Sequence, residues 1–191
     1  MFLDDKMKKE LKEIFKPFKK KVKFILFTQE LECQFCRETK GLLTELNEIS
    51  ENFSMEIFNF VNDKTETDKY GIDKIPATVL LDEEGKDYGI RYYGIPSGYE
   101  FSSLIEDIKM LGTGSTGLPA EVEAEVKKID QHVHMQVFVT PTCPYCPQAV
   151  LTAHKFAYLN EKIKGDMVEA TEFPHLANKY NVRGVPRTII N

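Results

Sequence analysis

An internal repeat constrains the fold of this 191-residue chain more than any other feature of its sequence. An offset of 110 residues superimposes one Cys-x-x-Cys pair on another, and it also superimposes Ile75-Pro76 on Val185-Pro186. The chain has four cysteines, Cys33, Cys36, Cys143 and Cys146, and all four belong to these two pairs. Two copies of one structural unit, with insertions confined to loops, account for this pattern.

Each copy predicts the same order of strands and helices. It begins with a short apolar run rich in Val, Ile and Phe, which is typical of a buried strand. The cysteine pair follows at once and opens a stretch with apolar residues at helical spacing. A second strand, a short helix, the proline and a β-branched strand complete the shared part. These elements are predicted at residues 22–28, 34–49, 55–61, 65–70 and 77–81 in the first copy, and at residues 133–140, 147–161, 165–170, 174–180 and 188–190 in the second.

The first copy is longer than the second. Gly85 marks a hairpin, after which a strand at residues 88–92 and a helix at residues 98–111 are predicted. A Gly/Ser-rich linker then separates the units, so that we assign residues 1–116 to the first unit and residues 117–191 to the second. The second unit lacks the last strand and helix of the first, and we expect that it is truncated. The sheets of the two units can join edge to edge.

Charge and hydropathy exclude two classes of function. The net charge of −5 provides no basic field for a nucleic-acid backbone. Residues 1–16 place apolar side chains at helical spacing among charged ones, and they contain no uninterrupted apolar run of membrane-spanning or signal-peptide length. We therefore predict a cytoplasmic protein with an amphipathic first helix. We also predict that this protein binds neither nucleic acid nor membranes.

The cysteine pairs carry the predicted chemistry. A thiolate attacks disulfides, whereas a free cysteine with a pKa of about 8.5 is mostly protonated at neutral pH. The unpaired N–H groups and the macrodipole of a helix N-terminus stabilise an anion, which favours a thiolate at Cys33 and Cys143. Cys36 and Cys146 follow one helical turn later, so they can close a disulfide or resolve a mixed one.

The residues around the second pair predict the stronger site. Pro144 is expected at the start of the helix, where its missing N–H costs little. In the first unit, Glu30 and Glu32 lie just upstream of the pair, and their negative charges would disfavour a thiolate. We therefore rank Cys143 above Cys33 as the principal nucleophile.

The repeated prolines predict a substrate-binding element. Pro76 and Pro186 enter strands to which they cannot donate a hydrogen bond, and such a proline suits a tight or cis connection. A cis proline beside the cysteines would leave the backbone of Ile75 or Val185 free to pair with an extended peptide. These four residues are therefore candidates for binding a protein substrate.

The order of a strand, a Cys-x-x-Cys helix and a later proline-led strand resembles the thioredoxin and glutaredoxin superfamily. Cys143-Pro144-Tyr145-Cys146 is the typical glutaredoxin tetrad. With the stretches at residues 88–96 and 137–147, the tandem arrangement resembles the glutaredoxin-like protein disulfide oxidoreductases of thermophilic archaea and bacteria. This likeness covers nearly the whole chain.

The resemblance implies a fold, a reaction and partners. It implies an α/β protein of two tandem thioredoxin-like units, each with three α/β/α layers, a mixed sheet and a cis proline beside its cysteines. It also implies an enzyme that reduces, oxidises or isomerises protein disulfides in the cytosol. The exchange needs no bound cofactor. The resemblance suggests a thioredoxin-reductase-like flavoprotein as the external reductant, while the glutaredoxin tetrad leaves glutathione open.

Other interpretations of the same residues stay open. The four cysteines could bind one structural zinc, or they could form disulfides that staple a non-enzymatic interaction module. One pair, Cys33 with Cys36, could be silent while the other is catalytic. The chain could also be an electron-transfer module dedicated to a peroxidase, like the tandem thioredoxin-like part of alkyl hydroperoxide reductase flavoproteins. His132 and His134 alternate on a predicted strand, and we interpret them as a solvated face and not as metal ligands.

Overall fold

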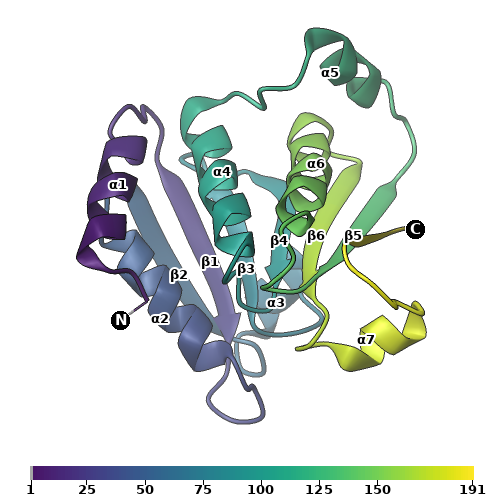
Figure 1. Ribbon diagram of the computed structural model, residues 1–191, viewed down its shortest axis with the longest axis horizontal. Helices are drawn as coiled ribbons and strands as arrows, with labels where there is room; N and C mark the ends of the chain where they lie inside the picture. Colours follow the sequence, from purple (N-terminus) through teal and green to yellow (C-terminus); the bar gives the residue numbers. More distant parts are fainter. Residues whose placement is uncertain (1) are drawn as a thin grey trace.

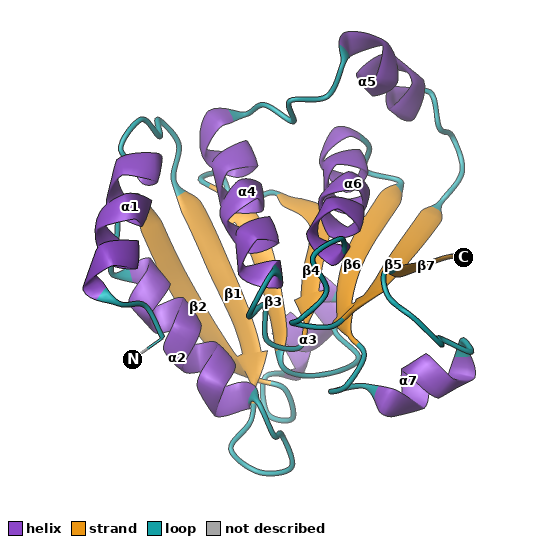
Figure 2. Ribbon diagram, viewed as in Figure 1, coloured by secondary structure: helices purple, strands orange, loops and turns teal. Residues whose placement is uncertain are grey.

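A seven-stranded sheet runs through the molecule, with helices on both of its faces (Figures 1 and 2). The computed structural model describes residues 2–191. The first half of the chain contains α1 (Asp5–Phe15), β1 (Val22–Thr28), α2 (Cys36–Asn47), β2 (Phe53–Asn59), α3 (Lys64–Tyr70), β3 (Ala77–Asp82), β4 (Asp87–Tyr93) and α4 (Glu100–Thr113). The second half contains α5 (Ala120–Lys127), β5 (Val133–Val139), α6 (Cys146–Leu159), β6 (Ile163–Glu169), α7 (Pro174–Lys179) and β7 (Arg187–Ile190). These three layers with a mixed sheet confirm the predicted α/β class.

Local sequence signals explain where these elements form and end. The apolar run at residues 22–28 forms β1, and residues 77–81 of β3 are all buried, as expected for a strand covered on both faces. Asp4 caps α1, because its side chain accepts a hydrogen bond of 2.7 Å from the Met7 N–H. Gly71 ends α3 with a φ of 62°, a left-handed conformation that favours glycine.

Strand direction brings both cysteine loops to one edge of the sheet. The strand order is β2-β1-β3-β4-β6-β5-β7. β3 is antiparallel to both β1 and β4, and β6 is parallel to both β4 and β5. β1 and β5 therefore point in the same direction. The loops that follow these two strands, which carry the cysteine pairs, leave the sheet at the same edge.

Backbone pairing of β4 with β6 joins the two units. Ile90 lies opposite Gly165, and Tyr93 lies opposite Val168, in parallel register. The two sheets thus join edge to edge. A Cβ atom at Gly165 would lie 2.9 Å from backbone atoms of Ala153, so a glycine here allows α6 to pack closely on β6.

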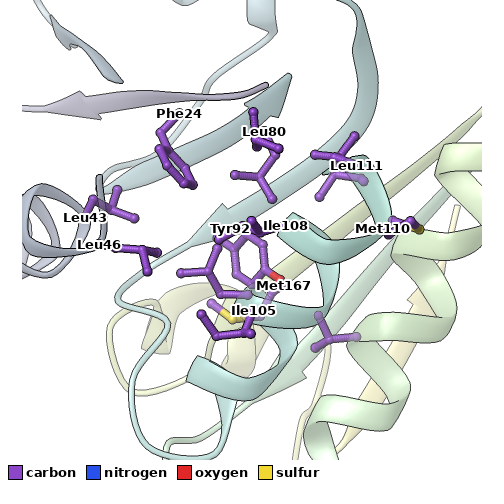
Figure 3. Close-up of a cluster of buried hydrophobic side chains, with 14 of the residues drawn as sticks. Phe24, Leu43, Leu46, Leu80, Tyr92, Ile105, Ile108, Met110, Leu111 and Met167 are labelled. Carbon is purple, nitrogen blue, oxygen red and sulfur yellow. The ribbon is translucent and has the colours of Figure 1, made fainter. Parts of the chain in front are cut away.

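Two hydrophobic cores cover the faces of the joined sheet. The core under α1, α2, α4 and α6 takes side chains from both units, including Phe24, Leu80, Tyr92 and Met167 (Figure 3). The core under α3 and α7 lies on the other face. There the rings of Tyr70 and Phe27 lie 5.8 Å apart, as do those of Tyr180 and Phe138, so both repeated tyrosines pack against a strand phenylalanine.

We expect Met167→Ala to destabilise both units together. Met167 is fully buried in β6 and lies opposite Tyr92 of β4 and Val137 of β5. Its truncation should lower the free energy of unfolding by about 2–5 kcal/mol. Thermal unfolding should remain one transition because the core is continuous.

The matched control is Met7→Ala on the exposed side of α1, which should change the stability by less than about 0.5 kcal/mol. Two separate transitions, of which only one moves in Met167→Ala, would contradict the continuous core.

Candidate active sites at the two cysteine pairs

Both cysteine pairs are closed as disulfides in the loops after β1 and β5. Cys33 is bonded to Cys36 and Cys143 to Cys146, and the Cα atoms of each pair lie 5.5 Å apart. In each pair the first cysteine is the more exposed, since Cys33 is half-buried and Cys143 is 7% exposed, against 2% for Cys36 and 0% for Cys146. This exposure suits a first cysteine that meets substrate and a second one that resolves the mixed disulfide.

The two pairs are well separated along the edge that they share. β3, β4 and β6 lie between β1 and β5 in the sheet. Four strand spacings separate the ends of β1 and β5, which lead to the two pairs, by about 19 Å. Strand pairing holds this separation, because each strand in the series is hydrogen-bonded to the next.

Each helix begins at the second cysteine and not at the first. α2 starts at Cys36, and α6 starts at Cys146. The prediction that Pro144 starts the helix was therefore wrong: Pro144 lies in the preceding turn, and Pro147 occupies the first turn of α6. Pro147 suits that position because the first N–H groups of a helix have no intrahelical acceptor.

Charges of both signs surround the first pair. A groove of about 530 Å³ is lined by both cysteines and by Glu30, Arg37, Lys40 and Asp63, among other residues. The prediction for this site considered only the acidic residues upstream of the pair. Arg37 and Lys40 were missed. They follow Cys36 by one and four residues, so they lie in the first turns of α2.

The second pair is built against residues of the first unit. The Tyr99 N–H donates to the Pro141 carbonyl at 3.0 Å, so the loop before α4 holds the turn that leads to Cys143. α4 and α6 pack side by side (Figure 1), and both begin at the edge of the sheet that carries the cysteines. Glu100 and Cys146 are the first residues of these two neighbouring helices.

Glu100 is a buried carboxyl group at the start of α4, the helix that packs against α6. Only 1% of its surface is exposed, and burial raises its pKa to about 7. Ser103 donates a hydrogen bond of 2.7 Å to its Oε2 atom. Sequence reasoning missed Glu100, although polar residues at positions 100, 103 and 107 share one face of an otherwise apolar helix.

A second carboxyl group with a raised pKa lies between the two sites. Glu172 follows β6 and accepts a hydrogen bond of 2.7 Å from the Ile95 N–H, which follows β4. Burial, with the nearby charges of Glu169 and Glu38, raises its pKa to about 7. A Cβ at Gly94 would lie 2.7 Å from Glu172 Oε1, so glycine is needed for this close approach. Glu172 therefore links the two units at the active edge.

Both repeated prolines lie at the edge of the sheet that carries the cysteines. The Ile75-Pro76 and Val185-Pro186 bonds are cis. Ala77 pairs with Phe27 of β1, and Arg187 pairs with Phe138 of β5. Each proline therefore enters its strand beside the end of the strand that leads to a cysteine pair.

The histidines at the start of β5 do not form a metal site with other residues. His132 precedes the strand, and Nε2 of His134 contacts Oδ2 of Asp166. Within residues 2–191, no three His, Cys, Asp or Glu side chains are grouped so that they could hold a metal ion.

Comparison with known families matches both halves of the chain. The sequence model of the thioredoxin-like domain matches residues 7–109, and that of the thioredoxin domain matches residues 133–191. Among curated proteins, the F subunit of alkyl hydroperoxide reductase of Staphylococcus aureus is 23% identical over 99% of this chain, and the match covers 34% of that relative. The corresponding protein of Pseudomonas aeruginosa is 26% identical over 81% of this chain and 27% of its own length. The chain thus spans about a third or less of these relatives.

Two solved structures superpose on nearly the whole molecule. A protein disulfide oxidoreductase from Aeropyrum pernix is 30% identical, with a TM-score of 0.92 over 100% of this chain and 85% of that chain. The F subunit of the alkylhydroperoxide reductase of Enterococcus faecalis is 28% identical, with a TM-score of 0.93 over 100% of this chain and 91% of that chain. Separately, no helix within residues 2–191 is both long and apolar enough to cross a membrane.

We expect Glu172→Gln to flatten the pH dependence of stability. The folded pKa of Glu172 is about 7, above the value of 4.5 for an ordinary glutamate, so the fold favours the protonated form. Its contribution is present at low pH and is lost as the pH rises through 7, at a cost of about 2 kcal/mol after allowance for its partial exposure. Chemical denaturation at pH 5 and pH 8 should show a smaller difference in the variant than in the unchanged protein.

Glu51→Gln is the matched control, because Glu51 is exposed. If Glu172→Gln and Glu51→Gln lose equal stability between pH 5 and pH 8, the assigned role of Glu172 is wrong.

Proposed function

We propose that this chain, which belongs to the family of thioredoxin-like domains, is an enzyme that exchanges dithiols and disulfides with protein substrates. The sequence model of that family matches more than half of the residues of the chain. The tandem thioredoxin-like organisation is confirmed, and the chain is a homologue of thiol–disulfide oxidoreductases with two Cys-x-x-Cys disulfides. One observation carries the proposal: each disulfide lies at the start of a helix and at the same edge of the sheet as a proline-led strand.

In this proposal, Cys143 is the principal nucleophile. Its thiolate attacks a substrate disulfide and forms a mixed disulfide, which releases one substrate thiolate. The sulfur of Cys146 then attacks Cys143, and the second substrate thiolate leaves. The substrate gains two electrons, and the protein is left with the Cys143–Cys146 disulfide. Cys33 and Cys36 perform the same steps at the first site.

Glu100 supplies a proton acceptor for the second site. The Cys146 thiol must lose its proton before its sulfur can attack, and Cys146 is 0% exposed to solvent. Glu100 begins the neighbouring helix at the same edge of the sheet, and a pKa of about 7 suits an acid–base group that works at neutral pH.

The backbone before each proline is proposed to hold the substrate. Ile75 and Val185 lie at the active edge, where an extended peptide could pair with their main-chain groups next to Pro76 or Pro186. Binding through the main chain makes little demand on the substrate sequence, which suits an enzyme that acts on many protein disulfides.

The separation of the two pairs means that they do not exchange with one another directly. Exchange requires the attacking sulfur to reach the disulfide that it attacks, whereas the strands that lead to the two pairs end about 19 Å apart on one paired sheet. Electrons that pass from one pair to the other therefore need a carrier, such as a substrate protein or a second molecule. The same separation argues against one zinc ion held by all four thiolates, since Zn–S bonds measure about 2.3 Å.

The oxidised pairs need an external source of electrons. The exchange itself uses no bound cofactor, and we propose a cytosolic thioredoxin-reductase-like flavoprotein as the reductant. Glutathione is the alternative, on the basis of the tetrad at residues 143–146. Similarity to the F subunit of alkyl hydroperoxide reductase supports a place in a redox chain that includes a flavoprotein.

That similarity also supports a second candidate function, electron transfer to one peroxidase. The match to the Staphylococcus aureus relative covers 99% of this chain, and the fold superposes on the Enterococcus faecalis structure with a TM-score of 0.93. In this case the chain would act on few partner proteins, and unrelated protein disulfides would be poor substrates.

Turnover of insulin disulfides with dithiothreitol tests the proposed enzyme. We expect the intact chain to reduce insulin, Cys143→Ser to keep less than about a tenth of that rate, Cys33→Ser to keep more, and the double variant to have none. Equal losses in the two single variants would overturn the ranking of the sites. A folded chain without turnover would overturn the proposed enzyme.

A competition experiment separates the two candidate functions. The reduced chain is mixed with oxidised insulin and an oxidised peroxiredoxin, a thiol peroxidase, at equal concentrations. A general protein disulfide oxidoreductase should reduce both at rates within about tenfold of each other. Reduction of the peroxiredoxin alone would replace the first candidate with the dedicated electron-transfer module.

A further inference from the structure

A row of five polar side chains is buried between α4, α6 and β4, and the chemistry assigned above uses only one of them. None is more than 1% exposed. The row consists of Glu100, Ser103 and Asp107 on α4, Tyr92 on β4 and His154 on α6. A buried polar group without a partner destabilises a protein, so a row of this kind in an otherwise apolar core calls for an explanation.

Hydrogen bonds connect the members of the row. The Tyr92 hydroxyl donates to Asp107 Oδ2, and the same oxygen contacts Nδ1 of His154. Nearer the active edge, Ser103 bonds to Glu100 and also interacts with the Tyr92 hydroxyl. The row therefore extends from Glu100, the first residue of α4, to His154, which lies about two helical turns after the start of α6.

Three members of the row keep a polar atom that the internal bonds do not use. Oε1 of Glu100, Oδ1 of Asp107 and Nε2 of His154 are buried without a hydrogen-bond partner among residues 2–191. All three atoms belong to ionisable side chains. Because they share a site with little water, the charge of one changes the cost of a charge on the next.

We infer that Asp107 and His154 are positioning residues that set the charge of Glu100, so that Glu100 can accept the proton of Cys146 when the mixed disulfide is resolved. This inference rests on the proposed function. It extends the second site from a cysteine pair and one carboxyl group to a network that reaches the middle of the core and includes residues of both units.

The electrostatic effects of the two residues on Glu100 are opposite. The charge of His154 lowers the pKa of Glu100, whereas the charge of Asp107 raises it, and burial dominates both effects. Tyr92 on β4 is the other ionisable member of the row, and Cys146 is the first residue of α6. The faces of β1 and β3 that meet α4 contribute apolar side chains, including Phe24 and Leu80.

In the resolving step, one S–S bond forms while another breaks. Cys146 transfers its thiol proton to the Glu100 carboxylate, and its sulfur forms a bond with Cys143. The bond between Cys143 and the substrate sulfur breaks, and its electron pair leaves with the substrate as a thiolate. The two cysteines are oxidised to a disulfide and the substrate sulfurs are reduced. Glu100 then passes its proton to the departing thiolate or to water.

The two-stage release of thionitrobenzoate from dithiobis(nitrobenzoate) measures this step directly. A full-length chain with Cys33→Ser and Cys36→Ser retains only the second pair. Attack by Cys143 releases the first thionitrobenzoate at a rate that depends on reagent concentration. Attack by Cys146 releases the second thionitrobenzoate at a rate that is independent of reagent concentration. The midpoint of the pH dependence of this second rate shows where the proton acceptor changes its charge.

We expect this midpoint to move in opposite directions in two variants that alter the row. His154→Asn should move it to higher pH and Asp107→Asn to lower pH, each by about one unit. Glu100→Gln should abolish the midpoint near pH 7. Glu106→Gln, on the exposed face of the same helix, is the matched control and should leave it unchanged. A purely structural role would lower the melting temperature of both variants without opposite shifts of the midpoint.

The other outcomes of this experiment distinguish failure of the inference about Asp107 and His154 from failure of the proposed function. Two-stage release with a midpoint that is unmoved in Asp107→Asn and His154→Asn, or moved in the same direction in both, overturns the inference and leaves the proposed function standing. If His154→Asn does not fold, Asp107→Asn decides alone by a shift to lower pH or its absence. A folded chain that releases no thionitrobenzoate overturns the proposed function itself.

Discussion

The hydrogen bonding of β4 to β6 determines how the two cysteine sites of this molecule lie relative to each other. It joins two repeated units into one sheet and sets β1 and β5 pointing in the same direction, so that both cysteine pairs reach the same edge. The three strands between β1 and β5 also keep the ends of those two strands about 19 Å apart. Two sites that share a surface but cannot touch can act on two parts of one large partner, or on two partners, without short-circuiting one another.

The joined sheet also gives the repeated sites different surroundings. The first pair opens into a groove whose charged residues come from its own unit. The turn before the second pair is hydrogen-bonded to the loop before α4, and α4 packs against α6, so the second site takes part of its environment from the first unit. Duplication thus produced two similar backbones with different electrostatics, and this difference is a physical reason for the two sites to differ in reactivity.

Much of the fold could be predicted because strands and helices impose different periods on apolar residues. The run at residues 22–28 matches β1, and the offset between the cysteine pairs revealed the repeat. The helix starts were less predictable, because Pro144 and Pro147 both suit a helix N-terminus and only tertiary geometry distinguishes them. The buried row was missed because no local sequence signal marks His154, and its partner on α4 is known only once α4 and α6 are known to pack together. Side-chain contacts between units far apart in sequence leave no local pattern.

The most direct measurement of two-site exchange is the identification, by mass spectrometry, of covalent adducts in a chain that carries both Cys36→Ser and Cys146→Ser. Without resolving cysteines, a mixed disulfide with an oxidised protein substrate cannot be released within the chain. Two-site exchange predicts that substrate becomes joined mainly to Cys143 and to a smaller extent to Cys33, and that dithiothreitol releases it from both. A folded variant with free thiols at both positions that forms no adduct would contradict it.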